Sequence, residues 1–194
     1  MVENNKARRK TVDKWKKKKW FVIKASKLFD SKVLGETPAE RATQLTNRTI
    51  KVTLDKLTGQ RQKRDIIVHF KANDVQGQSI NTIISKFEVA KSSLGRIVRR
   101  RNSKVMFVEK VPVVGGDARI SIIVITARKA TASQRTGIRE ITKDRLSKFN
   151  GKEFEFIVKE LLLGNFTNNL QKDSSKVYMT KKVIASKATF TETK

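Results

Sequence analysis

The chain has 194 residues, of which 44 are lysine or arginine and 18 are aspartate or glutamate, so its formal net charge is +26. Such a charge opposes compaction of the free protein and favours an anionic partner, either a nucleic acid or an acidic membrane surface. No apolar run approaches the roughly 20 residues of a membrane-spanning helix, and the absence of cysteine excludes disulfides, thiolate metal sites and cysteine nucleophiles.

The first 19 residues lack apolar periodicity and are densely basic. We predict a flexible basic arm over residues 1–19 that becomes ordered on an anionic partner. Trp15 and Trp20 bracket the run Lys16, Lys17, Lys18 and Lys19, which favours a nucleic-acid arm over a solubilising tail. Trp20 is ambiguous because it also begins a strand-like segment. The apolar run from Trp20 to Ile23 is too short for a signal-peptide core of about 7–15 residues, so we expect a cytoplasmic protein.

Period-two alternation predicts that residues 20–127 are rich in β-structure. The expected strands cover residues 20–25, 49–55, 66–73, 79–87, 103–112 and 118–127. Hairpin turns are expected at residues 75–78 and at Val114-Gly115-Gly116-Asp117. Between the two hairpins, apolar residues at helical spacing predict a helix over residues 88–101.

The C-terminal part changes to helical spacing. Residues 128–175 are predicted to hold three helices, one starting near Ser133 and ending before Gly151, one ending at Gly164, and one from Phe166 to about Asp173. A last strand is expected over 177–185 and a tail over 186–194. The predicted fold is a single α+β domain over 20–185, with an antiparallel, barrel-like β-sheet of about six or seven strands and helices concentrated in the C-terminal half.

Catalytic chemistry has little support in the sequence. The single histidine, His69, lies on the strand face opposite Val68 and Phe70, so we expect a surface residue and no metal ligand. The glycines at 115 and 116 join two strands, which favours a turn over a phosphate loop. The scattered acids Asp55, Asp65, Asp74 and Asp117 are turn-like. We therefore expect no enzyme, metal or cofactor, and keep a metal-dependent nuclease as the enzymatic alternative.

A first basic cluster lies around the end of the predicted helix over 88–101. It consists of Arg96, Arg99, Arg100, Arg101 and Lys104. Guanidinium groups present forked donors that match phosphate oxygens. A helix C-terminus favours cations by only about 0.3–1 kcal/mol each, which accounts for one or two arginines but not for three in a row.

A second basic cluster lies where the strand over 118–127 leads into the next helix. It consists of Arg128, Lys129, Gln134 and Arg135. If Ser133 caps that helix, the free amides at its start form an anion site that these side chains surround. The alternative is an ordinary polar cap with solvated charges. The sequence shows no base-reading motif, so neutralisation of a phosphate backbone fits best, and structured RNA suits this mode better than sequence-specific DNA.

Several stretches together resemble the S3Ae family of archaeal and eukaryotic small-subunit ribosomal proteins, also written eS-one and unrelated to bacterial ribosomal protein S-one. The resemblance covers about Asp13 to Tyr178 and is carried by DKWKKKKWFVIKA, VLGETPAE, NRTIKVTLDKLTG, DVQGQS, GRIVRRRNSKV and TARKATASQRTGIREI. The length and the opening Asp13-Lys14-Trp15 resemble archaeal members. Ser26, Ala132 and Met179 replace the proline, threonine and proline usual in the family.

The resemblance implies a structural, non-enzymatic role in the small ribosomal subunit, with a β-barrel-like core. It also implies a position on the platform near the mRNA exit, against ribosomal RNA and neighbours such as ribosomal protein S-eleven, with mRNA near and no membrane. Under this hypothesis both basic clusters, together with Trp15 and the lysine run, contact RNA. The alternative of a different class is a free RNA chaperone or translation regulator that acts off the ribosome.

Overall fold

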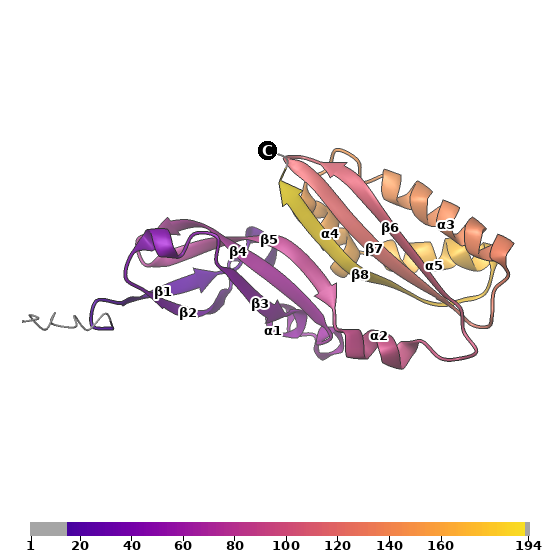
Figure 1. Ribbon diagram of the computed structural model, residues 1–194, viewed down its shortest axis with the longest axis horizontal. Coiled ribbons are helices and arrows are strands. Elements are labelled where there is room, and N and C mark those ends of the chain that lie inside the picture. The colour runs from indigo at the N-terminus through magenta and orange to yellow at the C-terminus, as the bar shows by residue number, and fades with distance from the viewer. Residues whose placement is uncertain (1–14, 193–194) are drawn as a thin grey trace, which may run out of the picture.

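The computed structural model describes residues 15–192, and its strands form one curled sheet (Figure 1). The strands are β1 Lys19–Lys24, β2 Val33–Ala39, β3 Thr49–Thr53, β4 Ile66–Gln76, β5 Ser79–Val89, β6 Lys104–Val113, β7 Gly116–Thr126 and β8 Thr180–Glu192. The helices are α1 Leu54–Thr58, α2 Lys91–Ile97, α3 Ala132–Ser147, α4 Phe154–Leu162 and α5 Phe166–Val177, with short 3-10 turns at Lys27–Phe29, Ala42–Gln44 and Arg61–Lys63. Within residues 15–192 no helix has the length and apolar content to span a membrane.

Strand β5 joins the two halves of the sheet. The strand order is β2-β1-β5-β8-β7-β6, and β4 pairs with both β5 and β3. One edge of β5 pairs with β4, while its other edge pairs with β1 near Ser79 and with β8 near Phe87. Every pairing is antiparallel except that of β1 with β5.

The predicted α+β class, the antiparallel sheet and the C-terminal concentration of helices are confirmed. The sheet has eight strands in the described residues, one more than the upper expectation. It remains open, because β2, β3 and β6 each pair on one edge only within that part of the chain. The additional strand is β2, which the sequence did not reveal because Gly35 and Pro38 interrupt it.

The main hydrophobic core lies between one face of the sheet and the C-terminal helices. Phe70 and Phe87 are fully buried from β4 and β5, and Ile138 and Leu170 are fully buried from α3 and α5. In Figure 1 the helices α4 and α5 lie behind β7 and β8. A second, smaller core that includes Phe21 and Ile80 lies in the N-terminal half. The helices therefore cover one face of the β6–β7–β8 sheet. On the opposite face of β7, Arg119 is exposed, whereas Ile123 and Ile125 are buried.

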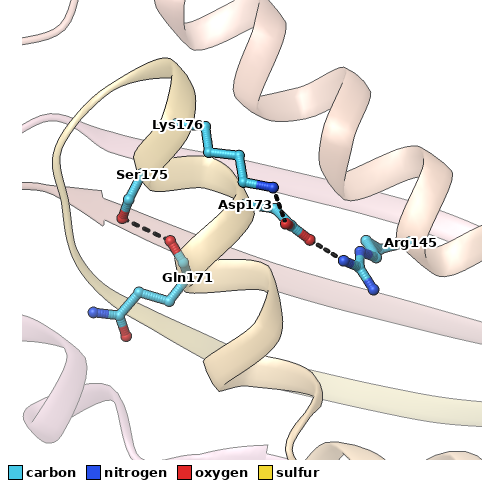
Figure 2. A network of polar contacts seen from close by, with 5 residues as sticks. All are labelled: Arg145, Gln171, Asp173, Ser175 and Lys176. Atoms are coloured by element: carbon cyan, nitrogen blue, oxygen red, sulfur yellow. Dashed lines mark hydrogen bonds and ion pairs between the residues drawn. The ribbon is translucent and has the colours of Figure 1, made fainter.

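Polar contacts fix the position of α5 against α3 (Figure 2). Arg145 of α3 donates a hydrogen bond to the Asp173 carboxylate of α5, and Lys176 Nζ lies 3.2 Å from the other carboxylate oxygen. The hydrogen bonds from Lys176 and Arg145 hold the pKa of Asp173 below its ordinary value. Ser175 Oγ donates to the Gln171 carbonyl oxygen at 2.7 Å in the same helix.

Three expected boundaries differ from the structure. Glu88 and Val89 pair with β4, so the helix predicted over 88–101 begins at Lys91, and it ends at Ile97. Helix α5 continues to Val177, so the last strand begins at Thr180 instead of residue 177. That strand extends to Glu192, since residues 187–192 pair with β7. Residues 186–192, expected in the tail, therefore belong to the sheet.

The surface position expected for His69 is wrong. Its residue exposure is 1%, and its Nε2 lies 3.1 Å from Glu88 Oε1. The side chain does point away from Val68 and Phe70, but β4 is an internal strand whose neighbours place Lys51 and Lys86 directly beside it. Burial, followed by the positive charge of Lys86, lowers the pKa of His69.

A pH titration of stability tests this burial. The lowered pKa means that the unfolded chain binds a proton first as pH falls. The contribution of His69 is therefore fully present above its ordinary pKa of 6.5 and is lost as pH falls below that value. We expect the melting temperature of the wild-type protein to fall between pH 7.5 and 5.5 more steeply than that of His69→Gln, which keeps a donor for Glu88 but does not titrate. Equal slopes for the two proteins would contradict the buried neutral imidazole.

Candidate nucleic-acid interface

The structure brings the two basic clusters together at one end of the β6–β7 ladder. Lys104, at the start of β6, pairs with Ile125, near the end of β7. The loop before β6 and the loop after β7 are therefore neighbours. We call this surface the basic corner and define it as Arg99, Arg100, Arg101, Lys104, Arg128, Lys129 and Arg135, all of which are exposed.

Hydrogen bonds between the two loops hold the basic corner in place. The Ser103 amide donates to Thr126 Oγ1 at 3.0 Å, and the Thr126 amide donates to the Ser103 carbonyl oxygen at 3.0 Å. The Ala130 amide donates to Ser103 Oγ at 2.9 Å. Arg99–101 and Arg128–Lys129 are consequently presented from one hydrogen-bonded unit.

The arginines follow helix α2 instead of belonging to it. The helix ends at Ile97, and Arg100 and Arg101 lie in a turn closed by a 3.0 Å hydrogen bond from the Asn102 amide to the Arg99 carbonyl oxygen. This corrects the expected helical placement. Because the effect of a helix dipole falls off within the last turn, a helix-end role does not explain these arginines.

No residue of the basic corner forms an ion pair with a carboxylate within residues 15–192. Seven cations on one surface without an internal counter-charge favour an external anion. Arg96 differs, since its Nη2 lies 3.4 Å from Asp65 Oδ1. It remains exposed on α2 but already has an acidic neighbour, so it is a weaker candidate for phosphate contact.

Thr131, not Ser133, caps helix α3. The helix begins at Ala132, and the Gln134 amide donates to Thr131 Oγ1 at 3.4 Å while the Thr131 amide donates to Gln134 Oε1 at 3.0 Å. This capping box uses two backbone amides and the side-chain oxygen of Gln134. Phosphate contact at this end of α3 therefore depends chiefly on the side chains of Arg128, Lys129 and Arg135, and less on open helix amides.

A third segment, which the sequence did not indicate, completes the basic corner. Tyr178 Oη donates to the Lys129 carbonyl oxygen at 3.1 Å, and the Ala127 amide donates to the Met179 carbonyl oxygen at 3.0 Å. Met179 is 72% exposed. The segment between α5 and β8 thus lies against the loop of the second cluster, through a long-range contact with no local sequence signal.

The basic arm emerges far from the basic corner. Residues 15–18 form a turn in which the Lys18 amide donates to the Trp15 carbonyl oxygen at 3.1 Å, with Lys18 Nζ 4.5 Å from the Trp15 ring centre. Lys19 already belongs to β1, and Trp15 to Trp20 are all exposed. In Figure 1 this end of β1 and the loop between α2 and β6 lie at opposite ends of the molecule. Residues 1–14 of the predicted arm lie outside the described residues.

The described residues do not contain a group of three or more acidic or imidazole side chains placed to hold a metal ion.

Two of the positions that depart from the family pattern have structural roles. Ser26 is buried and its hydroxyl group donates to the Glu155 carboxylate of α4, which ties the segment after β1 to the helical half. Ala132 occupies the first position of α3, next to the cap.

Within residues 15–192, an open α+β sheet carries helices on one face and, at one strand end, a basic surface whose members form no ion pair. The sequence model of the Ribosomal S3Ae family matches residues 6–194, and the chain belongs to this family. The expected resemblance is confirmed.

Relatives from archaea are similar over most of their length. The small ribosomal subunit protein eS1 of Sulfolobus acidocaldarius is 34% identical over 174 residues, which cover 88% of this chain and 88% of the relative. The protein of the same name from Sulfurisphaera tokodaii is 34% identical over 173 residues, covering 88% and 90%. That from Saccharolobus islandicus strain L.S.2.15 is 33% identical over 172 residues, covering 88% and 83%.

Replacement of the two cap candidates distinguishes their roles. Thr131→Ala removes the side-chain acceptor for the Gln134 amide, and we expect a loss of about 0.5–2 kcal/mol in the free energy of unfolding. Ser133→Ala leaves the capping box intact and should change stability by no more than about 0.5 kcal/mol. Denaturant unfolding of both variants measures the difference. A larger loss for Ser133→Ala than for Thr131→Ala would contradict the assigned cap.

Proposed function

We propose that this protein is a structural constituent of the small ribosomal subunit and that its basic corner binds ribosomal RNA. The carrying observation is that residues of two basic clusters, separated by a whole β-hairpin in sequence, meet at one strand end as the basic corner. No member of the basic corner forms an ion pair in the described residues, whereas Arg96 of the first cluster pairs with Asp65. The relatives named as small ribosomal subunit proteins support the same role. Its place is then in the ribosomes of the cytoplasm.

The chemistry of the proposed contact is electrostatic and non-catalytic. Exposed guanidinium groups of Arg99, Arg100 and Arg101 offer paired N–H donors that suit phosphate oxygens. Lys104 and Lys129 add point charges beside them. Binding releases counterions from the RNA, so affinity depends steeply on salt. Trp15 and Lys16–Lys19 add a further contact from the opposite end of the molecule, where an exposed ring and four exposed lysines can follow a strand of RNA.

The position within the subunit belongs to the same proposal. The family resemblance supports a site on the platform near the mRNA exit, with ribosomal RNA, ribosomal protein S-eleven and mRNA as neighbours. In such a site the protein positions RNA and takes no part in bond-breaking chemistry.

Charge removal at the basic corner tests the RNA contact. For Arg99→Gln, Arg100→Gln and Arg101→Gln combined, we expect the slope of log affinity against log salt for a 20-nucleotide RNA hairpin to decrease by about 2 to 3, since each lost phosphate contact removes about 0.7–0.9. The matched control combines Lys143→Gln, Lys159→Gln and Lys172→Gln. These exposed lysines on α3, α4 and α5 form no ion pair within residues 15–192. Equal salt slopes for the two variants would refute the proposed RNA contact at the basic corner.

Sedimentation of a native lysate tests the ribosomal role itself. The chain should migrate with small subunits at about one copy per particle through a moderate-salt wash, and RNase should abolish this migration. Migration only at the top of the gradient would reject the ribosomal role and support a free RNA-binding protein instead.

A further inference from the structure

A line of side chains crosses the sheet on the face away from the helices. Strand pairing aligns Lys110 of β6 with Arg119 of β7, Arg119 with Thr189 of β8, Thr189 with Lys86 of β5, Lys86 with His69 of β4, and His69 with Lys51 of β3. Residues directly opposite each other in antiparallel ladders share one face of a sheet. We call these six residues the cationic row.

The cationic row lies on the face opposite the main core. The chain neighbours of its members, including Val111, Ala118, Ala188, Phe87 and Val68, are buried in that core. Lys51, Lys110 and Arg119 are exposed, and the Lys86 side chain is 32% exposed. Helices α4 and α5 lie on the other side of β7 and β8 (Figure 1).

Positive charge dominates this line. The cationic row contains no carboxylate, and Lys51, Lys110 and Arg119 form no ion pair within residues 15–192. Glu88, in the next row, is bound to His69 at 3.1 Å and lies 3.6 Å from Lys86. Elsewhere on the face, Glu192 pairs with Lys71 at 3.4 Å, Asp117 is exposed, and Lys187 adds a further cation. Burial lowers the pKa of His69 most, and the positive charges of Lys86 and Lys51 lower it further.

The geometry suits a linear polyanion. Neighbouring strands lie about 4.8 Å apart, so a row that crosses six strands extends about 24 Å. A nucleic-acid strand carries a phosphate charge at every nucleotide, whereas a protein segment would need acidic side chains along the whole line. We propose that the cationic row is a second binding surface for the phosphate backbone of RNA, separate from the basic corner.

The two surfaces are distinct in position. Lys110 lies six residues along β6 from Lys104 of the basic corner, which corresponds to about 20 Å at 3.3 Å per residue. The proposal rests on the proposed RNA-binding function and extends it, because RNA held at both places is fixed in orientation.

The first test compares three charge-removing variants of the full chain with the same 20-nucleotide RNA hairpin. Lys51→Gln, Lys110→Gln and Arg119→Gln combined change exposed side chains only, and we expect the salt slope to decrease by about 2 to 3. The control is the variant with Lys143→Gln, Lys159→Gln and Lys172→Gln. Equal melting temperatures of the row variant and the control would verify folding before the slopes are compared.

The outcomes separate the two proposals. The row variant carries Lys51→Gln, Lys110→Gln and Arg119→Gln, and the corner variant carries Arg99→Gln, Arg100→Gln and Arg101→Gln. A reduced salt slope for both variants supports two RNA-binding surfaces. A slope reduced only for the corner variant overturns the cationic row and leaves the proposed function standing. Slopes equal to the control for both variants overturn both.

The second test uses His69, the only histidine of the chain, as a local probe. Binding of the hairpin over Lys51 and Lys86 should shift the imidazole NMR signals of His69 in the wild-type protein and in the corner variant. These signals report on the row because the ring lies between the two lysines. The row variant should show a much smaller shift at equal saturation. Absence of a shift in the wild-type protein at saturating hairpin overturns the proposal, as does a shift produced by poly-glutamate but not by the hairpin, which would identify an acidic protein segment as the ligand.

Discussion

The antiparallel pairing of β7 with both of its neighbours determines where the side chains of the two proposed RNA-binding surfaces lie. Its ladder with β6 brings Lys104 opposite Ile125 and so joins the two loops of the basic corner. Its ladder with β8 aligns Arg119 with Thr189 and carries the same face onward to β5. A register slip of one residue would turn each of these side chains to the other face and bring core residues such as Ile120 and Val124 into water. Burial of the β7 core face therefore fixes the basic surfaces as well.

Local signals in the sequence predicted much of the fold, for identifiable reasons. Alternating residues predicted β3 to β7, and glycine at positions 77 and 115 has positive φ in the two hairpin turns, as those turns require. The hairpin turn at Gly115 also indicates the register of the two strands that it joins. Counting outward from that turn places Lys104 and Ile125 together, which would have predicted the meeting of the two basic clusters.

Long-range packing explains what the sequence did not predict. His69 has the alternation of an outward residue, but β3 and β5 flank its strand and long side chains cover the ring, which no local pattern encodes. The contact of Tyr178 with Lys129 and the pairing of β8 with β5 join segments that are far apart in the chain. The cationic row crosses five pairings in succession. Those of β6 with β7 and of β4 with β5 are hairpins, but those of β7 with β8 and of β8 with β5 join distant segments, so the whole row becomes visible only in the folded sheet.

The distribution of acidic side chains explains how a folded protein tolerates so many cations. Several carboxylates are engaged inside the fold: Asp173 fixes α5 to α3, Asp65 accepts from Ser93 on α2, and Glu88 holds His69. Acids used in this way leave the exposed surfaces of the sheet with an excess of positive charge. Self-repulsion of this charge is costly for the free protein, and the proposed RNA partner would neutralise it.

Two separated contacts matter for a structural role because one contact leaves an RNA segment free to pivot. Once the first contact forms, the second becomes intramolecular, and its effective concentration is high when a rigid element sets the distance between the sites. The β6–β7 ladder is such an element, since it carries Lys104 and the loops of the basic corner at one end and Lys110 and Arg119 of the cationic row further along. A protein that contacts RNA along a fixed ladder sets the direction of the RNA as well as its affinity, and this direction is the property that a structural component of a ribonucleoprotein must supply.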